Sequence, residues 1–551
     1  MDRVVFKVIA PRQAKPKTDQ PTFVLQQDNW NDFAFRTQYQ LYYRRPGTAA
    51  KQDEDLIGSV KILRRGQKNV DGLQISKDFE TLGQDFCSVG ESLDYYERLS
   101  GLGRDIRSAV LKALRDVVQD PLLVEQFHSE EGWSISLFRD QKDAGREFRR
   151  VASSLVTGDY TSLAADGLEF SFQLPGWEQT ADFSFKAPPV GQDDFFAGEA
   201  ILPERIAVLV GKNGSGKSTL LARLARVAFG SVSERADNKL LALGQIEPNG
   251  IGFPRIISVT FSPFDSFRLP GLDSRKRRQV VKEVDKGEGR FVFIGLRDIV
   301  KEQTAVNSPQ PELESGAIEN SDDRLASTRL KSIDELAKEF AGFITRIREK
   351  NREPLFEDVL DDLLSDSPFG SIDDLQRHGQ FESIAISSFL RCSTGHKIVL
   401  LFASGLIANI EPRSLVLIDE PETHLHPPLL AALMHALRRI LRKHSAFAIV
   451  ATHSPVVVQE SLAQHVKVIR REGALTQINP IRIESFGEGL GLISAEVFGL
   501  QSNATDFHRV LDEVTDKLKS LEAIEALFQD GAMSHQARAY VMSLLSNSNK
   551  D

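Results

Sequence analysis

A glycine-rich run that also contains lysines and hydroxyl residues carries the clearest chemistry in the sequence. Its residues are Gly211, Lys212, Asn213, Gly214, Ser215, Gly216, Lys217, Ser218 and Thr219. The glycines allow a turn tight enough for successive backbone N–H groups to face phosphate oxygens, and a following helix would add its positive end. Lys217 would place a cation on the terminal phosphates, and the Ser218 hydroxyl would ligate Mg²⁺. The pattern G-x-x-x-x-G-K-[ST] therefore predicts a phosphate-binding loop.

The segments on either side of this run have the form that such a loop requires. Ile206–Val210 is a short apolar run, and Leu220–Phe229 has helical spacing. The alternative is a glycine-rich turn that only joins a strand to a helix. That alternative leaves the fixed positions of the pattern unexplained, so we expect a strand, a nucleotide-binding loop and a helix in succession.

Two carboxylates follow a second apolar run. Ser414–Ile418 leads directly into Asp419 and Glu420, about 200 residues after the loop. We expect Asp419 to hold Mg²⁺ through its water shell and Glu420 to orient or deprotonate an attacking water. Acidic residues in an ordinary turn are the alternative, and the strand that ends at them argues against it.

Histidines occur after two of the expected strands. Phe447–Ala451 ends near His453, and a polar residue at the tip of a parallel strand lies where open α/β sheets bind ligands, so His453 could reach the γ-phosphate. His424 and His426 could form a metal-ligand set with Glu422, but no further His or Cys cluster supports one. A turn-shaping or nucleotide-sensing role is the other interpretation of this pair.

Length and composition set limits on the class of protein. A chain of 551 residues exceeds one hydrophobic core, which predicts two or three domains or one heavily elaborated domain. A net charge of −9 means that any nucleic-acid contact would come from local basic patches. Two distant cysteines give neither a disulfide framework nor a zinc site, and we expect a reducing cytoplasm. The N-terminal stretch lacks the apolar core of a signal peptide, and no apolar run is long enough to span a membrane.

The pattern along the chain predicts an α/β protein with a mixed or parallel sheet, an N-terminal antiparallel β lobe, an inserted helical lobe and C-terminal helices. The expected divisions are 1–200 for a β-rich part with helical elaboration, 201–267 for the first half of the nucleotide-binding core, 268–383 for the inserted lobe, 384–475 for the second half of the core and 476–551 for a helical tail.

Two surface features have alternative interpretations. The aromatic alternation of Phe33–Tyr43 favours one face of a half-buried sheet over a base-stacking surface. The basic cluster Arg275–Arg278 could contact a phosphate backbone, although charge runs usually solvate a helix face.

Taken together, the motifs resemble the ATP-binding-cassette ATPase heads of the SMC, RecF and overcoming-lysogenization-defect superfamily. In that order of motifs, Phe261–Phe267 would be the loop after the second strand, Ser393–His396 the signature, and His453 the switch histidine. The resemblance implies that ATP and Mg²⁺ bind at a homodimer interface. The phosphate loop of one protomer would then face Ser393 and Gly395 of the other.

The sequence departs from the superfamily pattern at two places. His396 replaces the glutamine of the usual S-G-G-Q signature, and the segment F-S-P-F-D-S-F has no glutamine, which leaves Ser262 or Asp265 as the substitute near the metal. These departures predict slow or conditional ATP hydrolysis.

A narrower resemblance rests on E-P-E-T-H-L-H-P from Glu420, W-N-D-F-x-F-x-T from Trp30, the short insertion, and G-E-G-L-G from Gly487 before Val497-Phe-Gly. These segments look like the PtuA ATPases of Septu-type and retron-associated phage-defence systems. That resemblance implies an HNH nuclease partner (PtuB), sometimes with a reverse transcriptase and its RNA–DNA product. A RecF-type repair ATPase that binds DNA directly is the second hypothesis, and a membrane-transporter cassette is disfavoured.

Overall fold

The computed structural model describes most of the chain, and the structural statements that follow concern only that part. It comprises residues 4–16, 20–29, 35–45, 56–139, 144–164, 167–185, 202–306, 323–325, 327–364, 381–473, 475–498, 506–528 and 531–548. The start of the Trp30 segment, the Ser308–Pro311 break and Gly499 lie outside the described residues.

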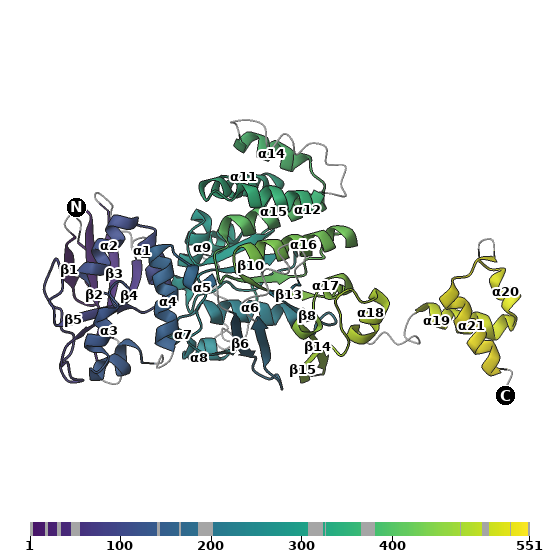
Figure 1. Cartoon of the computed structure of the whole chain (residues 1–551), viewed down its shortest axis with the longest axis horizontal. Coiled ribbons are helices and arrows are strands. Elements are labelled where there is room, and N and C mark those ends of the chain that lie inside the picture. The colour runs from purple at the N-terminus through teal and green to yellow at the C-terminus, as the bar shows by residue number, and fades with distance from the viewer. Residues whose placement is uncertain are drawn as a thin grey trace, which may run out of the picture.

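A seven-stranded sheet forms the centre of the molecule, in the order β11-β10-β12-β13-β8-β14-β15 (Figure 1). All neighbouring strands are parallel except the β14–β15 pair. The strands are β8 (Ile206–Val210), β10 (Ile256–Thr260), β11 (Phe291–Gly295), β12 (Leu415–Asp419), β13 (Phe447–Thr452), β14 (Val466–Glu472) and β15 (Leu475–Pro480). The apolar sequences of β8, β10, β11, β12 and β13 fit a parallel sheet that is covered on both faces. The α/β prediction is confirmed.

One face of this sheet carries a helical layer. Alternate residues such as Val208, Ile418 and Val450 point into its core. α15 is buried along almost its whole length, which fits its almost unbroken apolar sequence from Ile398. The layer consists of α11 (Ile333–Glu349), α12 (Glu353–Leu364), α14 (Phe381–Arg391), α15 (Thr394–Asn409), α16 (Pro427–Lys443), α17 (Pro455–Gln459) and α18 (Leu490–Phe498).

The other face packs on the helix that follows the glycine-rich loop and on a small antiparallel sheet. Leu209, Leu417 and Ile449 alternate with the residues of the first face and complete this second core. The small sheet has the order β7-β6-β9. The elements on this side are β6 (Leu168–Gln173), β7 (Ala181–Phe185), α6 (Lys217–Phe229), α7 (Val232–Arg235), α8 (Asn238–Leu241), β9 (Gln245–Glu247), α9 (Ser274–Lys286) and α10 (Ile299–Val306).

One strand of the central sheet lies where the sequence predicted only a helical lobe. Phe291–Gly295 forms β11 and pairs with β10 in parallel, which makes it the edge of the sheet. Its five residues are too few for periodicity to distinguish a buried strand from part of a helix. The helices of the first face therefore begin later than residue 268, with α11. The segment directly after residue 268 forms α9, which packs beside β11.

A second, five-stranded sheet with its own core forms the N-terminal unit, in the order β1-β2-β3-β4-β5. Tyr39 and Tyr42 are 0% and 2% exposed; Tyr39 lies in this core, and Tyr42 lies in a smaller cluster with Ile9 and Val24. Their burial favours the half-buried-sheet interpretation over a base-stacking surface. The elements are β1 (Phe6–Ile9), β2 (Thr22–Gln27), β3 (Gln38–Arg44), β4 (Leu56–Arg64), β5 (Phe86–Gly90), α1 (Leu93–Ser100), α2 (Arg104–Ala113), α3 (Leu122–Phe127), η1 (Trp133–Leu137), α4 (Ala144–Thr157) and α5 (Thr161–Ala164).

Ion pairs from α1 join this unit to the central sheet. Arg98 pairs with Glu283 of α9 at 2.7 Å, and Asp94 pairs with Arg290 beside β11 at 2.8 Å. Because both pairs are largely buried, removing one member would leave an uncompensated charge. Buried ion pairs as well as apolar packing therefore determine how the N-terminal unit contacts the elements of the central sheet.

Three short helices close the described chain: α19 (Asp506–Leu518), α20 (Leu521–Glu525) and α21 (His535–Ser548). They form a separate small core of Leu511, Ile524 and Val541 and lie apart from the rest of the molecule in Figure 1. Within the described ranges, no helix is long and apolar enough to cross a membrane.

Candidate nucleotide-binding site

The parallel strands bring their carboxyl ends to one edge of the central sheet. In the register of the sheet, Thr260 is opposite Asp419, Asp419 is opposite Ala451, and Thr452 is opposite Val210. The glycine-rich loop follows Val210, Glu420 follows Asp419, and His453 follows Thr452. The predicted site residues of β8, β12 and β13 therefore share one edge, where open α/β sheets bind ligands.

The glycine-rich loop connects β8 to α6 and needs glycine at both of its ends. A side chain at Gly211 would lie 2.2 Å from the carbonyl oxygen of Ile469 on β14. Gly216 has a φ of +103°, and a side chain there would lie 3.0 Å from the Trp177 ring. The loop is consequently held between β14 and the β6–β7 turn, with its backbone N–H groups leading into the α6 N-terminus.

Polar groups inside the loop match a polyphosphate. The Lys217 side chain is buried, and its Nζ donates to the carbonyl oxygens of Gly211 at 2.9 Å and Lys212 at 3.1 Å. Burial lowers the pKa of Lys217, and the charges of Glu420, Asp419 and Glu422 oppose that shift. Ser215 Oγ is buried and has no hydrogen-bond partner among the described residues.

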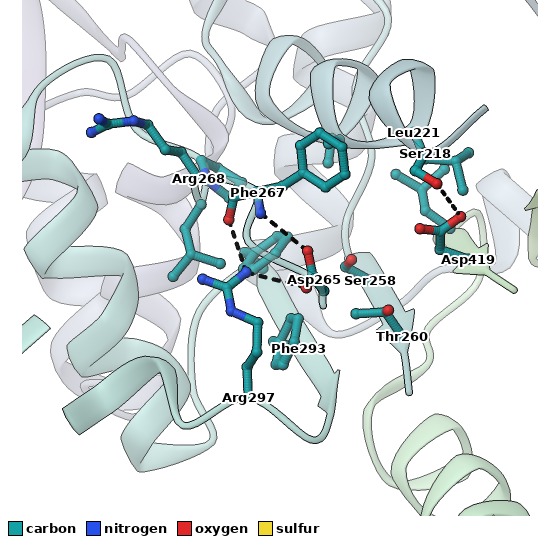
Figure 2. A pocket seen from close by; sticks show the side chains of 16 residues that line it. Ser218, Leu221, Ser258, Thr260, Asp265, Phe267, Arg268, Phe293, Arg297 and Asp419 are labelled. Atoms are coloured by element: carbon teal, nitrogen blue, oxygen red, sulfur yellow. Dashed lines mark hydrogen bonds and ion pairs between the residues drawn. The ribbon is translucent and has the colours of Figure 1, made fainter. Parts of the chain in front are cut away.

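Ser218 and Asp419 meet at the base of the loop. Ser218 Oγ donates to Asp419 Oδ1 at 2.9 Å (Figure 2). Burial raises the pKa of the Asp419 carboxyl to about 7; the Ser218 hydrogen bond lowers it, and the nearby Glu420 and Asp265 raise it. A hydroxyl and a carboxylate are the oxygen ligands that Mg²⁺ prefers, so this pair fits the predicted metal position.

Glu420 follows β12 in a strained conformation. Its φ is +49°, which is uncommon for a residue with a side chain, and its N–H donates to the Ala451 carbonyl at 2.8 Å. This bond continues the β12–β13 pairing by one residue and leaves the side chain 30% exposed at the edge of the sheet. Strain of this kind costs about 1–3 kcal/mol and concentrates at functional sites.

His453 lies next to both glutamates of the same turn. Its Nδ1 is 2.9 Å from Glu422 Oε1 and 3.7 Å from Glu420 Oε1. The hydrogen bond to Glu422 raises the pKa of His453, burial lowers it, and the charge of Glu420 raises it further. The structure thus brings the predicted catalytic residues Glu420, His453 and Lys217 into one cluster.

The loop after β10 places an acidic side chain beside Ser218 and Asp419. Asp265 lines the same cavity as those two residues, between α6, β10 and β11 (Figure 2). Its carboxylate is 3.1 Å from Arg297 Nη1, and Arg297 also donates to the Phe267 carbonyl at 2.8 Å. Ser262 instead accepts a bond from the Phe264 N–H at 3.3 Å. Of the two predicted substitutes for glutamine, Asp265 is the one that faces the cavity.

The signature residues lie at the start of α15. Ser393 caps this helix, and its hydroxyl is 2.6 Å from His396 Nδ1 and 3.4 Å from the His396 N–H. Burial lowers the pKa of His396, and the neighbouring His426 lowers it further. Within the described chain, Ser393 and Gly395 form no hydrogen bond with the glycine-rich loop. One chain alone does not bring the signature to the loop.

The His424 and His426 pair shapes the turn between β12 and α16. His426 is the N-cap of α16, because its Nδ1 accepts from the Leu429 N–H at 3.3 Å, and His424 has a φ of +68°. Over the described ranges, no group of three or more His, Cys, Asp or Glu side chains could hold a metal ion. The N-cap contact of His426 and the positive φ of His424 are what the turn-shaping interpretation expects.

Sequence reasoning missed the supports of this site. Arg297 is 1% exposed and pairs with Glu302 at 2.7 Å as well as with Asp265. Asp323 pairs with Arg223 at 2.7 Å and with Arg226 at 3.0 Å, both on α6. No local pattern marks these residues, because each pairing depends on how distant segments meet in the folded chain.

Comparisons with known proteins agree with an ATPase domain. Residues 305–459 match a family described as "AAA domain, putative AbiEii toxin, Type IV TA system". Protein ea59 of Escherichia phage lambda is 29% identical over 580 aligned residues, which cover 98% of this chain and 98% of that protein. The matched region contains Asp419, Glu420 and His453 but not the glycine-rich loop.

Solved structures similar to this chain include an ATP-binding cassette and an SmcHead. The ADP conformation of MJ1267, an ATP-binding cassette of an ABC transporter, is 12% identical with a TM-score of 0.27, covering 60% of this chain and 94% of that one. The SmcHead bound to the C-winged helix domain of ScpA is 12% identical with a TM-score of 0.27, covering 57% and 97%. At such scores these likenesses carry no argument about function, and the fold rests on the strand order described above.

Proposed function

We propose that this chain binds ATP with Mg²⁺ at Gly211–Thr219 and hydrolyses it slowly or conditionally. The observation that carries the proposal is the convergence of Lys217, Ser218, Asp419, Glu420 and His453 at one sheet edge from three parallel strands. Isolated motifs would not be expected to meet in this way unless they served one ligand. The unpaired Ser215 hydroxyl inside the loop supports a phosphate as that ligand.

Each residue then has a definable task. Lys217 would leave the loop carbonyls and pair with phosphate oxygens. The N–H groups of the loop and of the α6 N-terminus would donate hydrogen bonds to the same phosphates. Ser218 and Asp419 would hold Mg²⁺, which supplies charge neutralisation for the phosphates when bound. Glu420 would orient or deprotonate the attacking water, and His453 would donate to the terminal phosphate.

A head-to-head homodimer completes the proposed site. Ser393 and Gly395 lie at the N-terminus of a 16-residue helix whose backbone N–H groups suit an anion, yet they form no bond to the loop of their own chain. In the proposed dimer they reach the nucleotide of the partner. ATP would thus join two heads, and hydrolysis would release them.

The cellular role that we propose is the regulation of an effector in phage defence. Its support is the E-P-E-T-H-L-H-P turn, whose Glu420, Glu422 and His426 all have structural tasks at the site. In the PtuA-type systems that this turn resembles, the partner is an HNH nuclease, sometimes with a reverse transcriptase and its RNA–DNA product. The chain would restrain or license such a nuclease according to its nucleotide state.

Direct DNA binding of the RecF type is less well supported. It relies on the basic cluster Arg275–Arg278 of α9. Lys276 is paired with Glu234, Arg275 donates to the Tyr42 hydroxyl at 3.4 Å, and Arg277 donates to the Gly271 carbonyl at 3.2 Å. These intramolecular contacts explain the cluster without a nucleic acid.

Nucleotide binding and turnover by the purified protein test the proposal. Lys217→Ala should weaken Mg·ATP binding about 10- to 100-fold, because a hydrogen bond to a charged group contributes about 1.5–3 kcal/mol. Glu420→Gln should retain binding and lose turnover. Lys239→Ala on the exposed side of α8 is the matched control and should match the wild type. Equal ATP affinity in the wild type and Lys217→Ala would contradict the proposal.

A further inference from the structure

Glu422 is a buried carboxylate at the site with several hydrogen bonds and no role in the proposed chemistry. Glu422 Oε1 accepts from Thr452 Oγ1 at 2.8 Å, from the His453 N–H at 2.7 Å and from His453 Nδ1 at 2.9 Å. The carboxylate is only 10% exposed. All three donors come from the end of β13, so Glu422 links the turn after β12 to the neighbouring strand.

This arrangement fixes His453 at two points. The same oxygen holds the backbone N–H and the ring nitrogen Nδ1, which sets both the position and the rotation of the imidazole. When Nδ1 is engaged by a carboxylate, Nε2 is the nitrogen left for a ligand. The ring is 45% exposed, and its Nε2 forms no hydrogen bond within the described chain. Nε2 is therefore available at the edge of the sheet.

The charges around the ring favour its protonated form. Glu422 contacts it directly, Glu420 lies 3.7 Å from Nδ1, and Lys217 is the cation that opposes them. Burial raises the pKa of Glu422, but the bonds from the His453 side chain and backbone outweigh it, so that pKa lies below its ordinary value. A carboxylate that stays ionised next to a histidine stabilises the imidazolium.

We propose that Glu422 is a positioning residue that holds His453 through Nδ1 and thereby presents a proton-bearing Nε2 to the terminal phosphate of the nucleotide. The proposal rests on the proposed ATPase function and deepens it. Glu422 itself touches neither the phosphate nor the water. Its second oxygen, Oε2, is buried and has no partner among the described residues, so its role is confined to the contacts of Oε1.

The first test is independent of ATP. The ring protons of the 11 histidines can be followed by NMR during a pH titration of the nucleotide-free protein, and His453→Asn identifies the His453 signal by its loss. Glu422→Gln keeps the shape and an acceptor oxygen but removes the charge, so the His453 titration should move to lower pH. An unchanged His453 titration in Glu422→Gln would overturn the proposal.

Two further variants make this comparison specific. Thr452→Val removes one of the donors that hold the carboxylate and should move the His453 titration in the same direction, by less. Glu460→Gln is the control, because Glu460 follows α17, is partly buried and pairs with Arg438 at 2.6 Å instead of with His453. A shift in Glu460→Gln as large as that in Glu422→Gln would mean that any nearby charge suffices, which also overturns the proposal.

The second test is the pH profile of ATP turnover. Glu422→Gln should lower kcat about tenfold or more, as loss of a supporting partner typically does, with little change in KM. The alkaline limb of its kcat profile should move to lower pH with the His453 titration. A normal kcat profile despite a shifted titration would overturn the positioning role. Absence of turnover in the wild type would instead contradict the proposed function, while the NMR comparison would still decide how His453 is held.

Discussion

Ser218 and Asp419 are separated by 201 positions in the sequence and joined by a hydrogen bond of 2.9 Å. Ser218 lies in the first turn of α6, and Asp419 is the last residue of β12. Between their strands lies β13, which brings His453 to the same edge. This one contact joins the glycine-rich loop to the Asp419–Glu420 pair at the candidate site.

The Ser218–Asp419 pair predicts how nucleotide binding depends on Mg²⁺. Ser218→Ala and Asp419→Asn should each remove most of the gain in ATP affinity that Mg²⁺ gives, while binding without Mg²⁺ changes little, because each variant removes an oxygen ligand. Isothermal titration with and without Mg²⁺ measures this difference. Ser184→Ala, which removes an exposed hydroxyl bonded to Glu169 at 2.8 Å, is the control. Full Mg²⁺ dependence in Asp419→Asn would place the metal elsewhere.

The buried Arg297 predicts a large effect on stability. Arg297→Met would leave Asp265 and Glu302 without their cation, at a cost of about 3–5 kcal/mol in the free energy of unfolding. Urea unfolding measures the change. Lys68→Ala, which breaks an exposed pair with Glu131, should cost less than about 1 kcal/mol. Similar losses in the two variants would show that Arg297 is not the anchor of the loop after β10.

Two glycines predict opposite effects of the same substitution. Gly211→Ala would push a methyl group against the Ile469 carbonyl, so the loop or β14 must move, at a cost of about 1–3 kcal/mol. Gly342 lies inside α11 with no atom within 4 Å of the added carbon, so Gly342→Ala should stabilise the protein by about 0.5–1 kcal/mol. Thermal unfolding of the two variants checks both signs, and a stabilised Gly211→Ala would contradict the close approach of β14.

Asp116 predicts how stability depends on pH. It is fully buried in the N-terminal unit, and burial raises the pKa of its carboxyl from 3.8 to about 7, against the hydrogen bonds from Val118 and Tyr96. The folded state therefore holds a proton that the unfolded state releases above about pH 4. Stability should fall as the pH rises from about 4 to about 7, by at most a few kcal/mol, and then level off.

Asp116→Asn tests this sign directly. An amide cannot ionise, so the variant should lose that part of the pH dependence while the rest of the profile is kept. Chemical unfolding at a series of pH values in that window provides the comparison. A wild type and variant with parallel profiles between pH 4 and 7 would show that Asp116 does not hold a proton in the folded state.

The sequence predicts the parts of the site that depend on local pattern. The loop at Gly211–Thr219, the strand before Asp419 and the strand before His453 are each marked by a short apolar run and a polar end. Because parallel strands end at a common edge, their meeting also follows from the class of fold. The turn-shaping interpretation of His426 also depends on local sequence, because His426 directly precedes a helix that begins with proline.

Other parts depend on contacts that no local pattern carries. In the sequence alone, Glu422 is indistinguishable from an ordinary acidic residue in a turn. The pairing of β12 with β13 in the fold is what places it beside His453. Arg297 and Asp265 follow neighbouring strands, and β11 is itself too short to be recognised by periodicity. The role of Ser393 and Gly395 depends on a second copy of the chain, so it remains a prediction.

The central claim is an ATP-dependent dimer of heads, and the mass of Glu420→Gln measured by light scattering tests it most directly. This variant should bind ATP without hydrolysing it, so its mass should rise from the monomer value of 61.4 kDa to twice that value when Mg·ATP is added. Adding Ser393→Arg to Glu420→Gln should abolish the rise, since the added side chain would block the partner's nucleotide. A mass of Glu420→Gln that is the same with and without Mg·ATP would contradict the account.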